Sequence, residues 1–247
     1  MDFANKVAIV TGGGTGIGRA ISTGLAAGGA LVVVNYSRSA DEAGTTVAEI
    51  EAAGGTAISV QADGADAAQT AALVSQTLDR FGRLDIVVNS AGTTVFVPFS
   101  DLDGIDEADW DRVMAVNVKA PWMLAKAAAK SLRADGGGAI VTISSVAGLR
   151  PGGSSLAYSV SKAATIHLTK GLAVALAPDV RVNSIAPGFV DTRWHSYASA
   201  ERKQQIADAS PLKSLVSPES IATAALECLR NDHMTGQVIA IDSGSQL

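Results

Sequence analysis

The chain has 247 residues, a length that suits one domain with a substantial core. Hydrophobic residues make up 47% of it and charged residues 17%, which excludes a disordered or coiled-coil chain. The net charge is −5 and there is no basic run, so we expect no nucleic-acid partner.

Short apolar runs alternate with helical patterns along the chain. The first half predicts strands at Lys6–Val10, Leu31–Asn35, Ala57–Gln61 and Leu84–Asn89, and helices at Gly16–Gly28, Asp41–Ala53 and Asp66–Phe81. The second half predicts strands at Ala139–Ser144, Val180–Ile185 and Gln237–Ile241, and helices at Glu107–Leu132, Ala157–Ala177 and Pro218–Arg230. Pro121 predicts a bend or a local adjustment in the long helix that contains it.

This alternation predicts an α/β fold: a single-domain, doubly wound (Rossmann) and mostly parallel seven-stranded sheet with helices on both faces. No change of composition marks a second domain, so residues 1–247 are expected to form one dinucleotide-binding and catalytic unit. Residues 189–210 show no clear periodicity and are a candidate substrate lid.

The first residues enter a strand pattern without the basic start and apolar stretch of a signal peptide. No apolar run has the length needed to span a bilayer. Cys228 is the one cysteine, so no internal disulfide can form, which fits a reducing compartment. We therefore expect a cytoplasmic protein without a membrane partner.

A glycine-rich turn, Thr11 to Gly18, joins the first predicted strand to the first predicted helix. Its glycines are spaced G-x-x-x-G-x-G at Gly12, Gly16 and Gly18. Glycine lets the backbone approach a ligand closely, and the N–H groups and dipole at a helix N-terminus favour an anion. The position of the turn predicts a pyrophosphate-binding site of a dinucleotide fold.

The end of the second strand bears on the choice between NAD and NADP. An acidic residue there would bind the ribose hydroxyls and repel a phosphate. The sequence instead reads Asn35, Tyr36, Ser37, Arg38, and Ser37 and Arg38 could hold a 2′-phosphate. This favours NADP(H) over NAD(H).

Tyr158 and Lys162 are spaced i and i+4, which places both side chains on one face of a helix. A free tyrosine has a pKa of about 10, too high for acid–base work near neutrality. A nearby ammonium favours the phenolate and lowers that pKa. The pair alone also fits an ordinary surface contact.

Four further motifs accompany this pair. They are the glycine turn, Asn89-Ser90-Ala91-Gly92, Ser144-Ser145 and Pro187-Gly188, each after a predicted strand. In this order the motifs resemble those of the short-chain dehydrogenase/reductase family, from about Phe3 to Gly244. The resemblance implies an NAD(P)(H)-dependent oxidoreductase that transfers hydride between nicotinamide and a carbonyl or secondary alcohol.

The resemblance also implies residue roles. Tyr158 would be the acid/base, Lys162 would lower the pKa of Tyr158 and hold the nicotinamide ribose, and Ser145 would bind the substrate oxygen. Asn117 would support a water-mediated proton relay. The cofactor would be bound by Gly12, Thr15, Gly16, Ile17, Gly18, Tyr36, Ser37, Arg38, Asp63, Asn89, Ala91, Gly92, Tyr158, Lys162, Pro187, Gly188, Val190 and Thr192. Asp63 would face the adenine amino group, and Thr15 stands where many NADP-dependent relatives have Arg.

Alternatives stay open at this point. Fold alone does not give function, so a non-catalytic dinucleotide sensor is the alternative from another class. Among enzymes, the chain resembles both 3-oxoacyl thioester reductases and sugar or polyol dehydrogenases. The stretch A-V-A-L-A-P-D-V, where such reductases often carry an arginine, favours a small free substrate over a carrier-linked one. The resemblance also implies a homotetramer.

No metal site is expected, because His167, His195 and His233 are scattered and Cys228 has no cysteine partner. Phe189, Trp194 and Tyr197 either line an apolar pocket or pack the candidate lid against the core or another subunit.

Overall fold

The computed structural model describes residues 1–134 and 136–247. Its centre is one seven-stranded sheet in the order β3-β2-β1-β4-β5-β6-β7, with every neighbouring pair parallel. The predicted doubly wound α/β fold is confirmed. The strands are β1 (Val7–Thr11), β2 (Leu31–Tyr36), β3 (Thr56–Gln61), β4 (Ile86–Asn89), β5 (Gly138–Ile143), β6 (Val180–Pro187) and β7 (Val238–Ile241).

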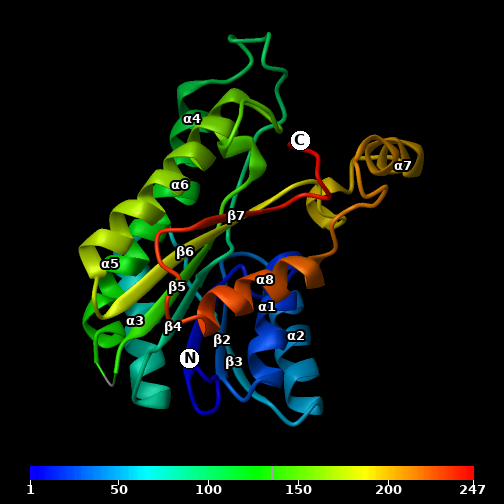
Figure 1. Ribbon diagram of the computed structural model, residues 1–247. Helices are drawn as coiled ribbons and strands as arrows, with labels where there is room; N and C mark the ends of the chain where they lie inside the picture. Colours follow the sequence, from blue (N-terminus) through cyan, green and yellow to red (C-terminus); the bar gives the residue numbers. More distant parts are fainter. Residues whose placement is uncertain (135) are drawn as a thin grey trace.

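Helices cover both faces of the sheet (Figure 1). The helices α1 (Gly16–Ala27), α2 (Ala40–Ala52) and α8 (Pro218–Arg230) lie on one face. The helices α3 (Ala67–Phe81), α4 (Glu107–Met114), α5 (Ala120–Leu132) and α6 (Leu156–Leu176) lie on the other. The remaining α-helix, α7 (Ala200–Ala209), projects beyond the sheet at the end where the C-terminus lies.

The apolar runs of the central strands are explained by burial on both faces. In β1, Ala8 and Val10 pack in the core under α1 and α8, whereas Val7 and Ile9 pack in the opposite core under α3 and α5. All four side chains are fully buried. Fully burying a Val or Ile side chain contributes roughly 1.5–3 kcal/mol, so the alternation anchors the strand from both sides.

The order of the strands changes direction between β1 and β4. From β1 the chain adds β2 and β3 on one side of the sheet, and from β4 it adds β5, β6 and β7 on the other side. In open α/β sheets a ligand binds at such a switch point, beyond the carboxyl ends of the strands. Thr11 at the end of β1 accepts hydrogen bonds from the backbone N–H groups of Ser90 and Ala91 (both 3.1 Å). The loops after β1 and β4 are thereby held together at this edge.

The predicted long helix 107–132 is confirmed in its bounds, and its residues form α4, a π-helical turn and α5 in succession. It is interrupted by a π-helical turn, η1 (Ala115–Lys119), and Pro121 lies in the first turn of α5. The irregularity expected near Pro121 is this π-turn, which precedes the proline. Proline is tolerated in a first helical turn, where its missing N–H is of little consequence.

Residues 189–210 contain more regular structure than their sequence pattern indicates. A short 3-10 turn, η3 (Arg193–His195), precedes α7. Ala207 is the buried residue of α7, so the helix has no apolar stripe from which it could be predicted. Its N-terminus is capped by Ser199, whose hydroxyl accepts from the Arg202 backbone N–H (3.2 Å).

Candidate active site

The glycine turn between β1 and α1 leaves room for an anion. Gly12 and Gly16 have positive φ angles of 62° and 49°, which other residues rarely adopt. A Cβ on Gly18 would overlap the carbonyl oxygen of Gly12. Thr15 precedes α1 without capping it, so no side chain satisfies the first N–H groups of this helix. These features fit the pyrophosphate of a dinucleotide.

A cleft of about 1190 Å³ extends from this turn to Tyr158 and α7. Most of the sequence-predicted site residues line it. They are Gly12, Thr15, Gly16, Ile17, Gly18, Tyr36, Ser37, Arg38, Ala91, Gly92, Ser145, Tyr158, Lys162, Pro187, Gly188, Val190 and Thr192. Asp63, Asn89 and Asn117 are not among the lining residues.

Two of these three residues support loops and strands. Asn89 is buried and donates from Nδ2 to Thr142 Oγ1 (3.2 Å), which joins β4 to β5. The carboxylate of Asp63 is exposed and accepts from the Ala65 backbone N–H (2.9 Å). The residue before it, Ala62, donates its N–H to the Tyr36 carbonyl (2.9 Å), so Asp63 lies next to the cleft wall.

At the end of β2, the cleft ends in a basic side chain. Arg38 is exposed on the cleft wall, and within the described residues it forms no ion pair. Folds that bind NAD have an acidic residue near the end of the second strand. Here Asn35 is buried near that end and donates from Nδ2 to the carbonyls of Val60 (3.2 Å) and Ala62 (3.1 Å). It therefore ties β2 to β3.

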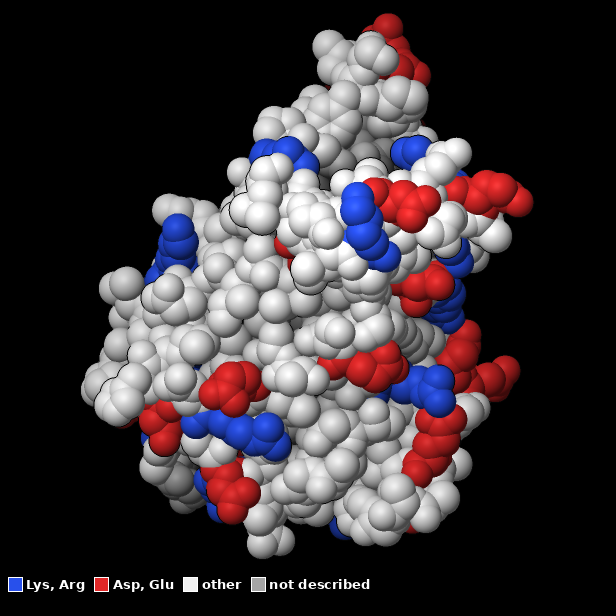
Figure 2. Space-filling model, turned by 45° about the vertical axis from the view of Figure 1, so that its right-hand side comes forward, with Lys and Arg blue, Asp and Glu red and all other residues white. Residues whose placement is uncertain are grey.

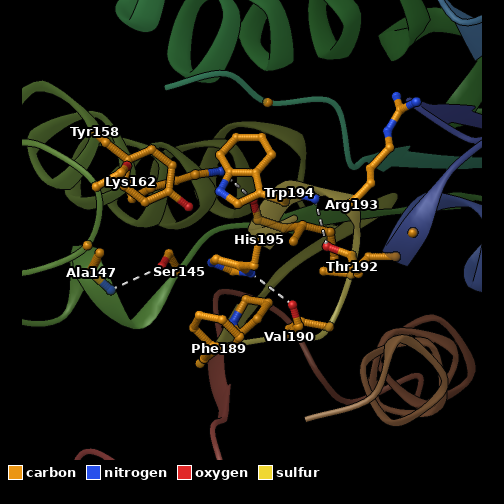
Figure 3. A pocket seen from close by; sticks show the side chains of 18 of the residues that line it. Ser145, Ala147, Tyr158, Lys162, Phe189, Val190, Thr192, Arg193, Trp194 and His195 are labelled. Carbon is orange, nitrogen blue, oxygen red and sulfur yellow. Dashed lines mark hydrogen bonds between the residues drawn. The ribbon is translucent and has the colours of Figure 1, made fainter. Parts of the chain in front are cut away.

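Tyr158, Lys162 and Ser145 converge on one wall of the cleft (Figure 3). Tyr158 and Lys162 come from the first turns of α6, whose N-cap Ser155 accepts from the Tyr158 backbone N–H (3.2 Å). Ser145 follows β5 and accepts from the Ala147 N–H (3.1 Å). Lys162 Nζ lies 5.6 Å from the centre of the Tyr158 ring and donates to the Ile143 carbonyl (2.9 Å).

Burial controls the protonation of this wall. It raises the pKa of Tyr158 to about 12, although a hydrogen bond with the Ser145 side chain lowers that pKa in part. It also lowers the pKa of Lys162 to about 8. The direction for Tyr158 is opposite to the one expected from Lys162. The ammonium lies over the ring and bonds to a backbone carbonyl, so desolvation of the phenolate outweighs it.

Asn117 lies behind this wall. Its side chain is 2% exposed, accepts from the Thr93 N–H (2.9 Å) and donates to the Thr93 carbonyl (2.9 Å). Its Nδ2 also donates to Ser161 Oγ (2.9 Å). Asn117 therefore fixes the loop after β4 against α6. The loop residue that it holds, Thr93, is next to Gly92 on the cleft wall.

Aromatic side chains form the opposite wall, in the segment that follows β6 (Figure 3). The Trp194 ring lies 6.0 Å from that of Tyr158. His195 stacks on Phe189 with ring centres 3.8 Å apart, and its Nδ1 lies 2.9 Å from the Val190 carbonyl oxygen. Burial lowers the pKa of His195.

Sequence reasoning missed several cleft residues. Phe96 packs edge-on against Tyr197 with ring centres 4.6 Å apart, and Phe99, Arg150, Arg202 and Gln246 also line the cleft. These residues belong to no motif and come from loops and α7, which only the folded chain brings together. The sequence offered one signal for them: residues 96–99 lie between the predicted strand Leu84–Asn89 and the predicted helix Glu107–Leu132 and belong to neither.

The segment after β6 is held by contacts on the other side of the cleft. The Arg193 guanidinium pairs with Glu42 at the start of α2 (2.6 Å) and donates to Ser39 Oγ (2.9 Å). A Cβ on Gly16 would lie 3.3 Å from Thr192 Cγ2. Residues 192 and 193 therefore lie over the glycine turn.

Over residues 1–134 and 136–247, no cluster of three or more His, Cys, Asp or Glu side chains could hold a metal ion. Within the same residues, no helix combines the length and hydropathy needed to cross a membrane.

Comparisons with known proteins agree with this geometry. The family model described as short chain dehydrogenase matches residues 6–203. The 3-oxoacyl-[acyl-carrier-protein] reductase of Synechocystis is 38% identical over 244 residues, covering 97% of this chain and 96% of the relative. The cis-4-hydroxycyclohexanecarboxylate dehydrogenase of Sinomonas cyclohexanicum is 34% identical over 247 residues, covering 98% and 97%.

A solved structure gives the same result. The structure of a short chain dehydrogenase from Burkholderia cenocepacia in complex with NADP superposes with a TM-score of 0.92 at 34% identity, covering 100% of both chains. The chain therefore belongs to the short-chain dehydrogenase/reductase family and is an oxidoreductase that uses a nicotinamide dinucleotide.

Proposed function

We propose that this enzyme interconverts a carbonyl compound and a secondary alcohol with NADP(H), and that Tyr158 is its acid/base. The observation that carries the proposal is the meeting of Ser145, Tyr158 and Lys162 on one wall of the cleft that begins at the glycine turn. When bound, the cofactor supplies or accepts the hydride.

Each side chain on this wall has a task that its surroundings support. Tyr158 is protonated at neutral pH because burial raises its pKa, so it can donate its phenolic proton to a carbonyl oxygen that becomes an alkoxide. Ser145 orients that oxygen from the end of β5. The ammonium of Lys162 stabilises the phenolate left behind. In the alcohol oxidation direction the same phenolate accepts the proton.

Asn117 is proposed as a support for the proton relay. Its side chain hydrogen-bonds with Thr93 and Ser161, so it acts by holding the loop after β4 in place against α6. A water path to bulk solvent would then refill the proton of Tyr158 through Lys162.

The preference for NADP(H) is supported by Arg38 and Ser37 on the cleft wall. A guanidinium that forms no ion pair with residues 1–134 and 136–247 suits the 2′-phosphate, and Tyr36 precedes it on the cleft wall. We assign Asp63 to the adenine amino group. Pro187, Gly188, Val190 and Thr192 are assigned to the nicotinamide, and the remaining glycine-turn and Asn89–Gly92 residues to the pyrophosphate and adenosine.

Two substrate classes follow from the relatives. A small free alcohol or ketone fits the aromatic wall beside Tyr158. A 3-oxoacyl thioester is the second candidate, and the Synechocystis reductase, named for that reaction, supports it. Absorbance assays of reduced nicotinamide with a panel of cyclic ketones and an acetoacetyl thioester test both. Turnover of none of these compounds with either cofactor would contradict the proposal.

The remaining assignments concern the whole molecule. Residues 189–210 are proposed as the substrate lid, and a homotetramer in the cytoplasm as the working form. An apolar hollow between α4, α5 and α6, lined by Met114, Val118, Trp122 and Leu168, supports self-association. Trp122 is 44% exposed there. Light scattering at micromolar concentration should give a tetramer, and a monomer would contradict this assignment.

A further inference from the structure

The charges of the cleft differ from those of the chain. The net charge of the chain is −5, yet none of the described residues that line the cleft is Asp or Glu. Five lining residues are basic: Arg38, Arg150, Lys162, Arg193 and Arg202. On the face shown in Figure 2, by contrast, basic and acidic side chains are interspersed. The cleft is therefore a locally cationic site on an acidic protein.

Three of the five cations are accounted for by the features described above. Arg193 pairs with Glu42, and Lys162 bonds to the Ile143 carbonyl beside Tyr158. Arg38 lies at the end of β2, at the proposed 2′-phosphate site. Arg150 and Arg202 remain, and neither forms an ion pair within residues 1–134 and 136–247.

Both of these arginines lie at the aromatic end of the cleft, away from the glycine turn. Arg150 follows the short turn η2 (Val146–Gly148) that begins at Ser145. The same loop continues to Ser154, whose carbonyl accepts from the Val97 N–H (2.9 Å), next to Phe96. Arg150 donates to the Ser245 carbonyl (2.8 Å), which leaves its other donors available.

Arg202 reaches the same end from α7. It lies five residues after Tyr197, which precedes the helix and packs against Phe96 (4.6 Å between ring centres). The Arg202 guanidinium donates to Gln205 Oε1 on the same helix (3.4 Å), and the Arg202 backbone N–H donates to the N-cap Ser199 (3.2 Å). Two guanidinium groups from different elements therefore line the cleft that Tyr158 also lines.

We propose that the substrate carries an anionic group, a carboxylate or a phosphate, which Arg150 and Arg202 bind while its carbonyl or alcohol carbon lies at Tyr158. This inference rests on the proposed function and narrows its substrate class. Guanidinium groups bind carboxylates and phosphates through charge-assisted hydrogen bonds, and a half-apolar cleft strengthens such contacts relative to water. The two arginines are specificity residues, and the chemistry stays with Tyr158.

Binding of inert ligands tests the proposal without turnover. Titration calorimetry on the NADPH-saturated enzyme compares cyclohexanecarboxylate with its neutral amide, and pantetheine 4′-phosphate with pantetheine. We expect the anion of at least one pair to bind about tenfold more tightly than its neutral partner, which corresponds to the strength of one charge-assisted contact. A preference in the first pair identifies a small carboxylate as the source, and one in the second a phosphorylated thioester arm.

Matched variants locate the effect. Arg202→Gln and Arg150→Gln should each reduce the preference to within about twofold, Arg202→Lys should retain most of it, and Arg80→Gln, an exposed arginine on α3, should leave it unchanged. Equal binding within both pairs, or a preference that survives both glutamine variants, overturns the proposal. Since no turnover is measured, the proposal can fail while Tyr158 keeps its role, and the reverse.

Discussion

Thr165 Oγ1 shares its one proton between the backbone carbonyl of Asn117 (3.0 Å) and that of Ser161 on its own helix (2.8 Å). The Asn117 carbonyl is the one that would pair with residue 121 in a regular α-helix. Residue 121 is proline and has no N–H to give. The hydroxyl from α6 thus serves a backbone group in the π-turn between α4 and α5. This contact connects the irregular turn that carries Asn117 to the helix that carries Tyr158 and Lys162.

Thr165→Val should test this connection. Valine keeps the shape of threonine but leaves the buried Asn117 carbonyl without this donor, so we expect a loss of about 1–3 kcal/mol in the free energy of unfolding. Thr169→Val is the control, because among the described residues Thr169 Oγ1 donates only within its own helix, to the Thr165 carbonyl (3.0 Å). Urea unfolding of both variants measures the difference. Equal losses would contradict a specific role for the Asn117 contact.

Gly18→Ala should abolish cofactor binding, because its Cβ would overlap the Gly12 carbonyl oxygen and distort the glycine turn. Gly44→Ala in α2 is the matched control, since its Cβ would meet no atom within 4 Å and should stabilise the helix by about 0.5–1 kcal/mol. Fluorescence titration with NADPH measures binding. Wild-type affinity in Gly18→Ala would show that the turn does not hold the pyrophosphate.

Arg38→Gln should lower kcat/KM with NADPH by about tenfold or more and leave kcat/KM with NADH nearly unchanged, since only NADPH has the 2′-phosphate. Steady-state rates at saturating second substrate give both values. A clear NADH preference in the wild-type enzyme would refute the cofactor assignment, and equal losses with both cofactors would refute the role of Arg38.

The rate of carbonyl reduction should fall as the pH rises through about 8. Burial lowers the pKa of Lys162 to about 8, so its ammonium is present below that pH and lost above it. Tyr158 stays protonated throughout, because its pKa is raised to about 12. A pH profile of kcat/KM for a ketone, with NADPH affinity measured in parallel, checks this. A profile that stays flat to pH 10 would contradict it.

The parts of the site that could be predicted from sequence are those set by local patterns. Tyr158 and Lys162 share a helix face because of their spacing, and the glycine turn lies at the carboxyl end of a buried strand because its neighbours are apolar. Such patterns identify each element separately. Their order along the chain predicted the fold, and the motifs at the strand ends predicted most of the cleft.

The rest depends on contacts between distant segments. The pKa direction of Tyr158 is set by burial in the folded chain, which spacing does not reveal. α7 has no apolar stripe, and the arginines at its side of the cleft belong to no motif. The π-turn at Asn117 needs the Thr165 hydroxyl from another helix.

Tyr158→Phe tests the central claim most directly, because it removes one hydroxyl and keeps the ring that packs against Trp194. NADPH binding and reductase turnover should be measured on the same preparation. We expect unchanged cofactor affinity and a loss of kcat of at least about a hundredfold, the usual contribution of a positioned acid. Turnover within a few fold of wild type would contradict the assignment of Tyr158 as the acid/base.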